Sequence, residues 1–559
     1  MTFVIMVKKR ELFGIYMKYK LLLLLIVVSG AVLRFYQLGI NPPSMTWDEV
    51  ALGYNAYSLG LDGRDEFGNF LPLAYLESFG DYKPPLYTYL DILPIKAFGL
   101  TPFAVRFPSA LLGSLSVLVT YFLVKRIFNS SKQKELYAIS AAAVFAFSPW
   151  HIMLSRAAFE ANVATFFIIT GVWAFLCAIQ GKKWLLVVST VSFVLSLYSF
   201  NSSRIVVPIL VGVLAAVFYK DLWKIKKQAI VACIIGVVLS SPLIPFMLSP
   251  QAKVRFQEVN IFTDPKLIEN RNQEIANDNN SVVSRIIHNH RVVYGLAYVQ
   301  HYMDHFNPSY LFTKGDVNPK FSIQDVGQMY LFDLPFLLLG IFFLIRKKEG
   351  YWWIIPIWLL IGLIPAGAAR ETPHALRTEA ALPTYQILVA YGLIQGALLV
   401  EKLVAKKVIK NALYGLVGIL FFTNVLYFQY QYVVHYPWRF SADWQDGYKE
   451  SIAYVNEHKD KYAQIYDSGS MGRPYIYYLF YTQTDPREFR KTMKVTRDVF
   501  GFVDVLSFGK YNFPKDISRV QKSKDTLYVS NPESLPSDSR KLKEIKRIDG
   551  KTSVVIYTY

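Results

Sequence analysis

The sequence predicts a polytopic α-helical membrane protein with a small α/β domain at its C-terminal end. Three observations support this fold class. Of the 559 residues, 53% are hydrophobic and 16% aromatic, which is more apolar than is usual for a soluble protein of this size. Apolar runs near the length of a membrane-spanning helix recur up to residue 432. Beyond residue 435 the composition becomes that of a soluble domain with short strands.

The apolar runs predict about eleven transmembrane helices. They cover roughly residues 20–39, 104–125, 136–154, 163–181, 184–200, 205–219, 229–248, 329–345, 351–367, 381–400 and 411–432. With the N-terminus in the cytoplasm, this topology places every lysine-rich short connection on the cytoplasmic side, as the positive-inside rule requires. No small-residue cleavage site follows the first run, so we expect an uncleaved first helix.

The segment from Leu86 to Leu100 is apolar but shorter than a bilayer span, and it contains Asp91 and Lys96. Counting it as a span would move the later lysine clusters to the outer side. We therefore expect an interfacial amphipathic helix on the outer surface.

The chain divides into two predicted domains. Residues 1–435 form the transmembrane domain, with outer loops at about 40–103 and about 250–328. Residues 436–559 form a soluble extracytoplasmic α/β domain. Its expected strands are Ala463–Tyr466, Gly501–Leu506, Thr526–Val529 and Ser553–Tyr557.

Charge and cysteine usage exclude other classes of protein. The net charge is +19, but the basic residues cluster between apolar runs as topology signals do, so no nucleic-acid partner is expected. Cys177 and Cys233 both lie within apolar runs, where neither a disulfide framework nor a cysteine zinc site is expected.

The outer loop at 40–103 contains the candidate active site. Asp48 and Glu49 open a probable helix from Glu49 to Leu59. As a purely structural pair they would cap that helix and complement its dipole. As functional groups they would supply a general base or a carboxylate that binds metal or acceptor. Lys83 precedes two prolines and is either an ordinary snorkelling lysine or a cation for a lipid-linked phosphate.

Further polar residues are predicted on the same outer side. Arg106 lies at the mouth of the second span, and Arg156 and Glu160 lie between the third and fourth. His374 and Arg377 belong to a later outer loop that either forms a solvated turn or binds substrate. Singly, each is expected to be an interfacial anchor or ion pair, but together they suit phosphate recognition.

A histidine pair in the long outer loop has metal-binding spacing. His301 and His305 are one helical turn apart, but no third ligand is marked by position, so we expect no metal site there.

In combination, three outer segments resemble the GT-C glycosyltransferases. They are Trp47-Asp48-Glu49, Tyr82-Lys83-Pro84-Pro85-Leu86 and the stretch from Arg106 to Gly113, and the stretches Ser155–Glu160 and Pro373–Arg377 are similar to those of bacterial members. The resemblance covers about residues 1–435. Within the GT-C enzymes, the chain is most similar to the protein O-mannosyltransferase and lipid A aminoarabinose transferase group. Bacterial members of this group are glycosyltransferase family 39-like enzymes.

The resemblance implies an inverting transferase. A mannose- or aminoarabinose-like sugar would pass from a polyprenyl-phosphate donor to a lipid, glycan or protein acceptor on the outer face of a prokaryotic plasma membrane. Asp48 matches the catalytic acid and Glu49 its partner, while Lys83 and Arg106 match positions near the donor phosphate. Glu160 stands where relatives often carry an aspartate. Arg156, His374 and Arg377 complete the expected substrate-binding residues.

Two alternatives remain open: a transporter or flippase, and a surface-glycan ligase or polymerase. Transporters usually show internal repeats and midplane charges, which this sequence lacks. No nucleotide cofactor is expected because no Walker-type sequence occurs. Dependence on a divalent metal is left open.

Overall fold

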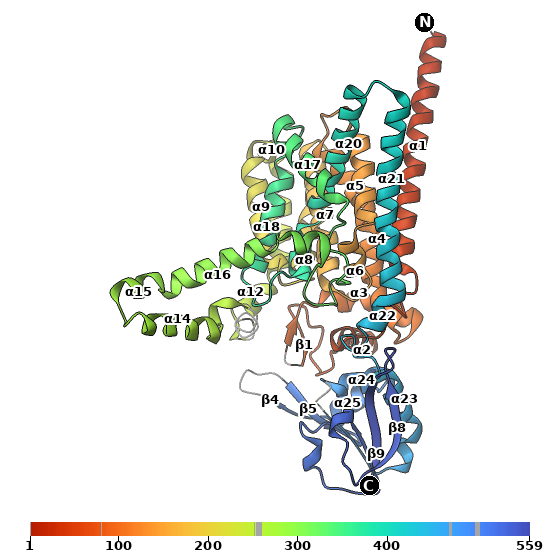
Figure 1. Ribbon diagram of the computed structural model, residues 1–559, viewed down its shortest axis with the longest axis vertical. Helices are drawn as coiled ribbons and strands as arrows, with labels where there is room; N and C mark the ends of the chain where they lie inside the picture. The colour runs from red at the N-terminus through yellow and green to blue at the C-terminus, as the bar shows by residue number, and fades with distance from the viewer. Residues whose placement is uncertain (1, 80, 251, 253–259, 469–471, 498–502) are drawn as a thin grey trace.

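The computed structural model describes residues 2–79, 81–250, 252, 260–468, 472–497 and 503–559. A helical bundle forms one end of the molecule and a domain containing a β-sheet forms the other (Figure 1). The N-terminus lies at the bundle end and the C-terminus at the opposite end. The predicted combination of a mostly helical chain with a C-terminal sheet is confirmed.

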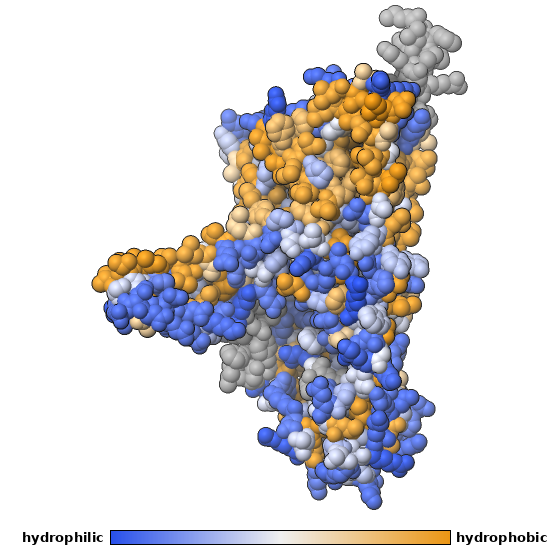
Figure 2. Space-filling view, viewed as in Figure 1, coloured by the Kyte–Doolittle hydropathy of each residue, from blue (hydrophilic) through white to orange (hydrophobic). Residues whose placement is uncertain are grey.

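The bundle accounts for the apolar runs of the sequence. Its helices are α1 (Thr2–Phe35), α4 (Pro102–Ile127), α5 (Lys134–Ala146), α6 (Pro149–Ser155), α7 (Glu160–Ile179), α8 (Leu185–Leu197), α9 (Ser203–Val217), α10 (Tyr219–Lys224), α11 (Lys226–Ser240), α12 (Leu243–Met247), α17 (Asp333–Lys347), α18 (Ile354–Gly367), α20 (Thr384–Leu403) and α21 (Lys407–Tyr430). Each predicted span coincides with one of these helices or with two in succession. On the face shown in Figure 2, their outer surface forms an apolar belt.

By length and composition, four helices in the described parts of the chain are able to cross a membrane: α4, α7, α20 and the helical run Lys407–Arg439. A fifth is added if α5 and α6, which meet at a 56° bend, count as one span. The bend falls before Pro149, which cannot continue the hydrogen bonding of α5. The number of eleven spans stays a prediction.

The segment predicted to be the first outer loop, about residues 40–103, folds into two helices and a hairpin between the bundle and the sheet (Figure 1). These are α2 (Trp47–Asp62), β1 (Leu76–Ser78), β2 (Asp81–Lys83) and α3 (Leu86–Phe98). The expected helix from Glu49 to Leu59 is confirmed within α2. The segment from Leu86 is helical as expected, and its place at a membrane interface stays a prediction.

The long outer loop contains an arm that projects sideways from the bundle (Figure 1). It consists of α14 (Pro265–Asn277), α15 (Val282–Ile287) and α16 (His290–Asp304), preceded by η1 (Ile261–Thr263) and followed by η2 (Ser309–Thr313). Short helices α19 (Ala375–Thr378), η3 (Glu379–Ala381), η4 (Gln431–His435) and α22 (Tyr436–Arg439) complete the connections. The predicted domain boundary after residue 435 falls at the end of η4.

The C-terminal region forms a seven-stranded mixed sheet in the order β4-β5-β6-β3-β7-β9-β8. Strand β3 runs parallel to β6 and β7, and the other pairs are antiparallel. The strands are β3 (Gln464–Asp467), β4 (Lys494–Arg497), β5 (Val503–Phe508), β6 (Tyr511–Asn512), β7 (Thr526–Ser530), β8 (Arg540–Lys546) and β9 (Thr552–Thr558). The helices are α23 (Tyr448–His458), η5 (Lys459–Lys461), α24 (Pro474–Tyr481), α25 (Pro486–Thr492), η7 (Ile517–Arg519) and η8 (Pro532–Ser534).

All four expected strands correspond to observed ones: β3, β5, β7 and β9. Residues 501–502 of the expected strand Gly501–Leu506 lie outside the described residues. Strand β8 was not predicted because its sequence, RKLKEIK, is mostly charged and lacks an apolar run. It pairs at the edge of the sheet, where charged side chains are common.

The first outer loop and the C-terminal region share one hydrophobic core. A single buried cluster includes Tyr54 of α2, Tyr87 of α3, Phe480 of α24 and Ile465 of β3. The hydroxyl of Tyr54 donates to the carbonyl of Thr484 across this junction (3.0 Å). The helix that carries the acidic pair is therefore packed against the C-terminal region as well as the bundle.

A glycine sets the spacing at this junction. A β-carbon at Gly53 would lie 2.5 Å from Cγ2 of Val105 and 2.9 Å from Cε2 of Phe480. We expect Gly53→Ala to lower the free energy of unfolding by about 1–3 kcal/mol, because α2 must move away from one of its neighbours. Thermal unfolding of the purified protein in detergent measures this effect.

Gly418→Ala is the matched control. It lies in α21 with nothing within 4 Å of an added β-carbon. Alanine is the better helix former there, so Tm should stay equal or rise. If the two variants unfold at the same temperature, close packing at Gly53 is not a constraint.

Candidate active site

The acidic pair opens α2, and its two carboxylates point into different environments. Thr46 is the N-cap residue, and its side chain forms a capping box with Glu49. Asp48 is therefore not needed as the cap. Consecutive residues of a helix point about 100° apart, and the structure buries Glu49 while leaving the Asp48 side chain 55% exposed.

Glu49 is saturated with hydrogen bonds. Its Oε1 accepts from Nε of Arg106 (2.8 Å) and from the backbone N–H of Ala158 (3.0 Å). Its Oε2 accepts from Nη2 of Arg106 (3.2 Å) and from the backbone N–H of Thr46 (3.1 Å). A carboxylate offers about four acceptor positions, so none is left for an acceptor hydroxyl. The expectation that Glu49 is catalytic gives way to a positioning role.

Arg106 uses all five of its N–H groups inside the protein. Besides the two bonds to Glu49, it donates to the carbonyls of Leu38 (3.2 Å), Pro42 (2.9 Å) and Ser44 (2.5 Å). A guanidinium has five N–H donors, so no donor remains for a phosphate. The expectation that Arg106 binds substrate is corrected: Arg106 holds residues 38–49 against α4.

Arg156 has a similar structural role. It donates from Nη1 to the carbonyl of Leu33 (2.7 Å) and from Nη2 to the carbonyl of Asn41 (2.9 Å). Its Nε donates to the hydroxyl of Tyr432 (3.2 Å), and its guanidinium lies over that ring. Arg156 is buried, and these contacts tie the end of α1 to η4. They use three of its five N–H groups, so its expected role in binding substrate stays a prediction.

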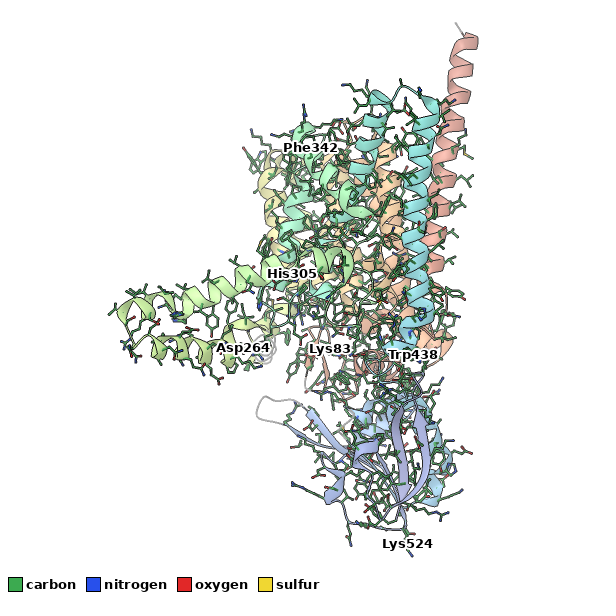
Figure 3. The ribbon with its side chains drawn as sticks, viewed as in Figure 1. Lys83, Asp264, His305, Phe342, Trp438 and Lys524 are labelled. Carbon is green, nitrogen blue, oxygen red and sulfur yellow. The ribbon has the colours of Figure 1, made fainter. Side chains whose placement is uncertain are left out.

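Lys83 and Asp48 form the ion pair at the centre of the candidate site. Nζ of Lys83 donates to Oδ1 of Asp48. The Lys83 side chain is only 8% exposed, and it lies between the bundle and the sheet domain (Figure 3). Burial lowers the pKa of Lys83, but the charges of Asp48, Glu160 and Asp81 together raise it above its usual value. The lysine is therefore charged at neutral pH.

Glu160 adds a second carboxyl group beside the Asp48–Lys83 ion pair. It is the first residue of α7 and interacts electrostatically with both Lys83 and Asp48. The structure thus brings together three of the sequence-predicted residues, Asp48, Lys83 and Glu160.

His374 and Arg377 belong to a second cluster that adjoins the first. The ring of His374 stacks on Phe321 (5.1 Å between centroids), and Phe321 also contacts Phe159 next to Glu160 (5.4 Å). Burial, followed by the charges of Arg377 and His305, lowers the pKa of His374 well below its usual value. The imidazole is neutral at pH 7, so it does not form a charged pair with Asp316, 3.9 Å away.

The histidine pair of the long loop is engaged with backbone groups. Nδ1 of His301 contacts the carbonyl of Ala369 (2.8 Å), and Nδ1 of His305 contacts the carbonyl of His301 (2.9 Å). Nε2 of His305 accepts from the backbone N–H of His374 (3.0 Å). Within the described residues, no group of three or more His, Cys, Asp or Glu side chains is arranged to hold a metal ion.

Two cations beside Asp48 were not identified from the sequence. Nζ of Lys320 lies 5.5 Å from the ring centre of Trp47, the residue before Asp48. The guanidinium carbon of Arg473 lies 4.7 Å from the ring centre of Phe79, which Lys83 also contacts at 5.4 Å. Lys320 comes from the long outer loop and Arg473 from the C-terminal region. Only the tertiary fold brings them here, so no local sequence signal marks them.

A known protein family matches the part of the chain that contains the candidate site. Residues 24–249 match the family model described as "Dolichyl-phosphate-mannose-protein mannosyltransferase". That range includes Asp48, Lys83 and Glu160. A protein of Aquifex aeolicus (strain VF5), described as uncharacterized, is 29% identical over 171 residues, which are 30% of this chain. The chain spans 32% of the length of that relative.

Two solved structures resemble nearly the whole chain. ArnT from Cupriavidus metallidurans bound to undecaprenyl phosphate is similar with a TM-score of 0.53 and 13% identity, covering 97% of this chain and 98% of ArnT. The apo form gives a TM-score of 0.50 and 12% identity, covering 98% of each chain. At this identity the likeness is one of fold, and it includes the C-terminal sheet as well as the bundle.

Replacing Arg106 tests its role in holding the acidic segment. Arg106→Lys keeps the charge but loses the fork that engages Glu49 and the three carbonyls. A lysine ammonium has three N–H donors in place of five, so at least two buried acceptors lose their partner. We expect each to lower the free energy of unfolding by about 1–3 kcal/mol. Arg487→Lys, at an exposed pair with Asp485, should change it by about 0–1 kcal/mol. Similar melting temperatures for both variants would exclude a structural role for Arg106.

A buried acid that contacts α2 predicts a pH dependence of stability. Glu66 accepts from Ser78 (2.7 Å) and Asn55 (3.3 Å). Burial raises its pKa to about 8, and those two hydrogen bonds lower it only in part. In the unfolded chain a glutamate has a pKa of about 4.3. Between about pH 4.3 and 8 the native state therefore binds more protons than the unfolded state, and stability falls as pH rises.

Glu66→Gln removes this titration. We expect Tm of the wild type to fall between pH 6 and pH 9 by more than Tm of the variant. The exposed Glu533→Gln serves as the control and should keep the wild-type difference. An equal fall in all three proteins would mean that Glu66 is ionised in the native state.

Proposed function

We propose that the chain is a glycosyltransferase of the GT-C superfamily, which transfers a sugar, with inversion, from a polyprenyl-phosphate donor to an acceptor at the outer face of a cell membrane. The observation that carries this proposal is the Asp48–Lys83 pair, an exposed carboxylate held beside a buried lysine. It lies between an apolar bundle, which suits a lipid donor, and a soluble region, which suits an acceptor (Figure 3).

The reaction needs a base and a cation, and the site offers both. Asp48 accepts the proton of the acceptor hydroxyl as its oxygen attacks the anomeric carbon. The bond from that carbon to the phosphate oxygen breaks, and the polyprenyl phosphate leaves with the electron pair. Lys83 holds the negative charge of the leaving phosphate. One displacement at the anomeric carbon inverts its configuration, so no enzyme nucleophile is required.

The ion pair suggests how the base is released. Lys83 is bonded to Asp48. A donor phosphate brings a second anion to the same ammonium group, which has three N–H donors. Sharing the lysine with the phosphate weakens its hold on the carboxylate, which becomes a stronger base. Donor binding would thus prepare Asp48 for the acceptor.

The remaining assignments follow from the resemblance and the ArnT-like fold. The donor lipid is an undecaprenyl or similar polyprenyl phosphate, because the similar ArnT structure is bound to undecaprenyl phosphate. The sugar is mannose- or aminoarabinose-like, and the acceptor is a lipid, glycan or protein. In the proposed topology, about eleven spans cross a prokaryotic plasma membrane, with the N-terminus in the cytoplasm and the sheet domain outside.

Sugar transfer by the purified protein in nanodiscs tests the proposal. A panel of radiolabelled polyprenyl-phosphate sugars is supplied, and both transfer and donor hydrolysis are measured. We expect Asp48→Asn to reduce turnover by about 10²–10⁴-fold because the base is lost. Lys83→Ala should reduce it by about 10²–10³-fold because the leaving charge is no longer stabilised.

Matched controls are available in the same chain. Asp525→Asn and Lys524→Ala make the same substitutions at exposed positions, and Figure 3 shows Lys524 at the far end of the sheet domain from Lys83. Both controls should keep wild-type turnover. A parallel assay with a chelator tests dependence on a divalent metal. Full activity of folded Asp48→Asn would exclude Asp48 as the base.

A further inference from the structure

The projecting arm has one apolar edge and one hydrophilic edge. In α16 the exposed side chains Val292, Leu296, Val299 and Met303 recur at intervals of four, three and four residues, which places them on a single face of the helix. Leu296 is 66% exposed. The neighbouring helix α15 adds four more large exposed side chains: Val282, Val283, Ile286 and Ile287.

The second layer of the arm is polar. Helix α14 exposes mainly charged and amide side chains, among them Lys266, Glu269, Gln273 and Glu274. Figure 2 shows the apolar side chains along the upper edge of the arm and the hydrophilic ones along its lower edge. The upper edge faces the same end of the molecule as the apolar belt of the bundle.

The arm is fixed to the bundle at its base. The hydroxyl of Tyr298 donates to the carbonyl of Ile364 (3.1 Å), and the hydroxyl of Tyr302 donates to the carbonyl of Leu360 (2.9 Å). Both acceptors belong to α18, so the direction of the apolar edge is set by the bundle.

We propose that this arm lies on the membrane surface, with the apolar edge of α15 and α16 inserted at the boundary between lipid headgroups and acyl chains. An apolar helical face of this kind binds the interface in proportion to its buried area. The lipid surface is favoured as the partner because the edge continues the direction of the bundle's apolar belt. Arg285 and Arg291 are exposed on the same two helices, and such basic side chains favour an anionic lipid surface.

The arm also holds the loop that carries His374. At the end of α16, His301 contacts the carbonyl of Ala369, and the hydroxyl of Thr372 donates to Asp304 (2.7 Å). His305 accepts from the backbone N–H of His374. Burial lowers the pKa of His305 to about 4, so its ring is neutral and Nε2 is free to accept this bond. Contact of the arm with lipid would therefore restrict the motion of residues 369–374. This effect does not depend on the reaction that the protein catalyses.

Depth-dependent quenching tests the lipid contact in the full-length protein in nanodiscs. Cys177 and Cys233 are first replaced by alanine, and a fluorophore is attached at Leu296→Cys on the apolar edge or at Gln273→Cys on α14. We expect nitroxide-labelled phospholipids to quench the Leu296 probe several-fold more than the Gln273 probe, and aqueous iodide to do the reverse. Equal quenching of both probes by iodide, with none by the lipids, would overturn the proposal.

Hydrogen exchange tests the connection to the loop. Leu296→Asp combined with Val299→Asp should remove the arm from the lipid and accelerate exchange of the amides at 369–376 several-fold. The matched control, Asn270→Asp with Gln273→Asp on α14, adds the same charge to the polar layer and should leave exchange unchanged. Wild-type exchange rates in the apolar-edge variant would overturn the connection.

Discussion

The buried ion pair between Glu49 and Arg106 is the constraint on which the candidate site depends. Removing both charges from water is costly, and a buried pair persists only where other hydrogen bonds satisfy its remaining groups. Here every acceptor position of Glu49 and every donor of Arg106 is filled by the turn before α2, by α4 or by the loop after α6. The pair fixes the direction of α2, and the preceding residue on the helix, Asp48, then faces outward beside Lys83. Of the two adjacent acids, Glu49 therefore holds the helix in place and Asp48 belongs to the candidate site.

Around Asp48, three regions of the chain meet on aromatic side chains of the first outer loop. Lys83 comes from the hairpin of that loop, Lys320 from the long loop after the arm, and Arg473 from the start of α24. Each ammonium or guanidinium group lies over the ring of Trp47 or Phe79. Aromatic faces hold cations without neutralising them. Stacking on a ring therefore leaves the positive charge of Lys320 and Arg473 in place, while Lys83 is also paired with Asp48.

The sequence predicted the bundle well and the site in part. Long apolar runs mark helices without reference to any partner, so each predicted span falls on a helix. Asp48 and Lys83 were identified because acid, lysine and double proline are local features of a polar segment. The role of Arg106 depends on partners 57 to 68 residues away, and no local pattern records such pairing. The arm was missed because its apolar positions are spread thinly through a long polar loop. Strand β8 was missed because an edge strand need not be apolar.

The core shared by α2 and the C-terminal region has a consequence for biosynthesis. Tyr54 and Thr484, which meet across this core, are separated by 430 residues. At a synthesis rate of about 5–20 residues per second, the acidic helix leaves the ribosome about 20–90 seconds before its last packing partner exists. During that interval the bundle can assemble around Arg106, but one face of α2 stays uncovered. A chain that ends before Thr484 would therefore lack the packing partner of α2 and leave apolar surface of the acidic helix exposed.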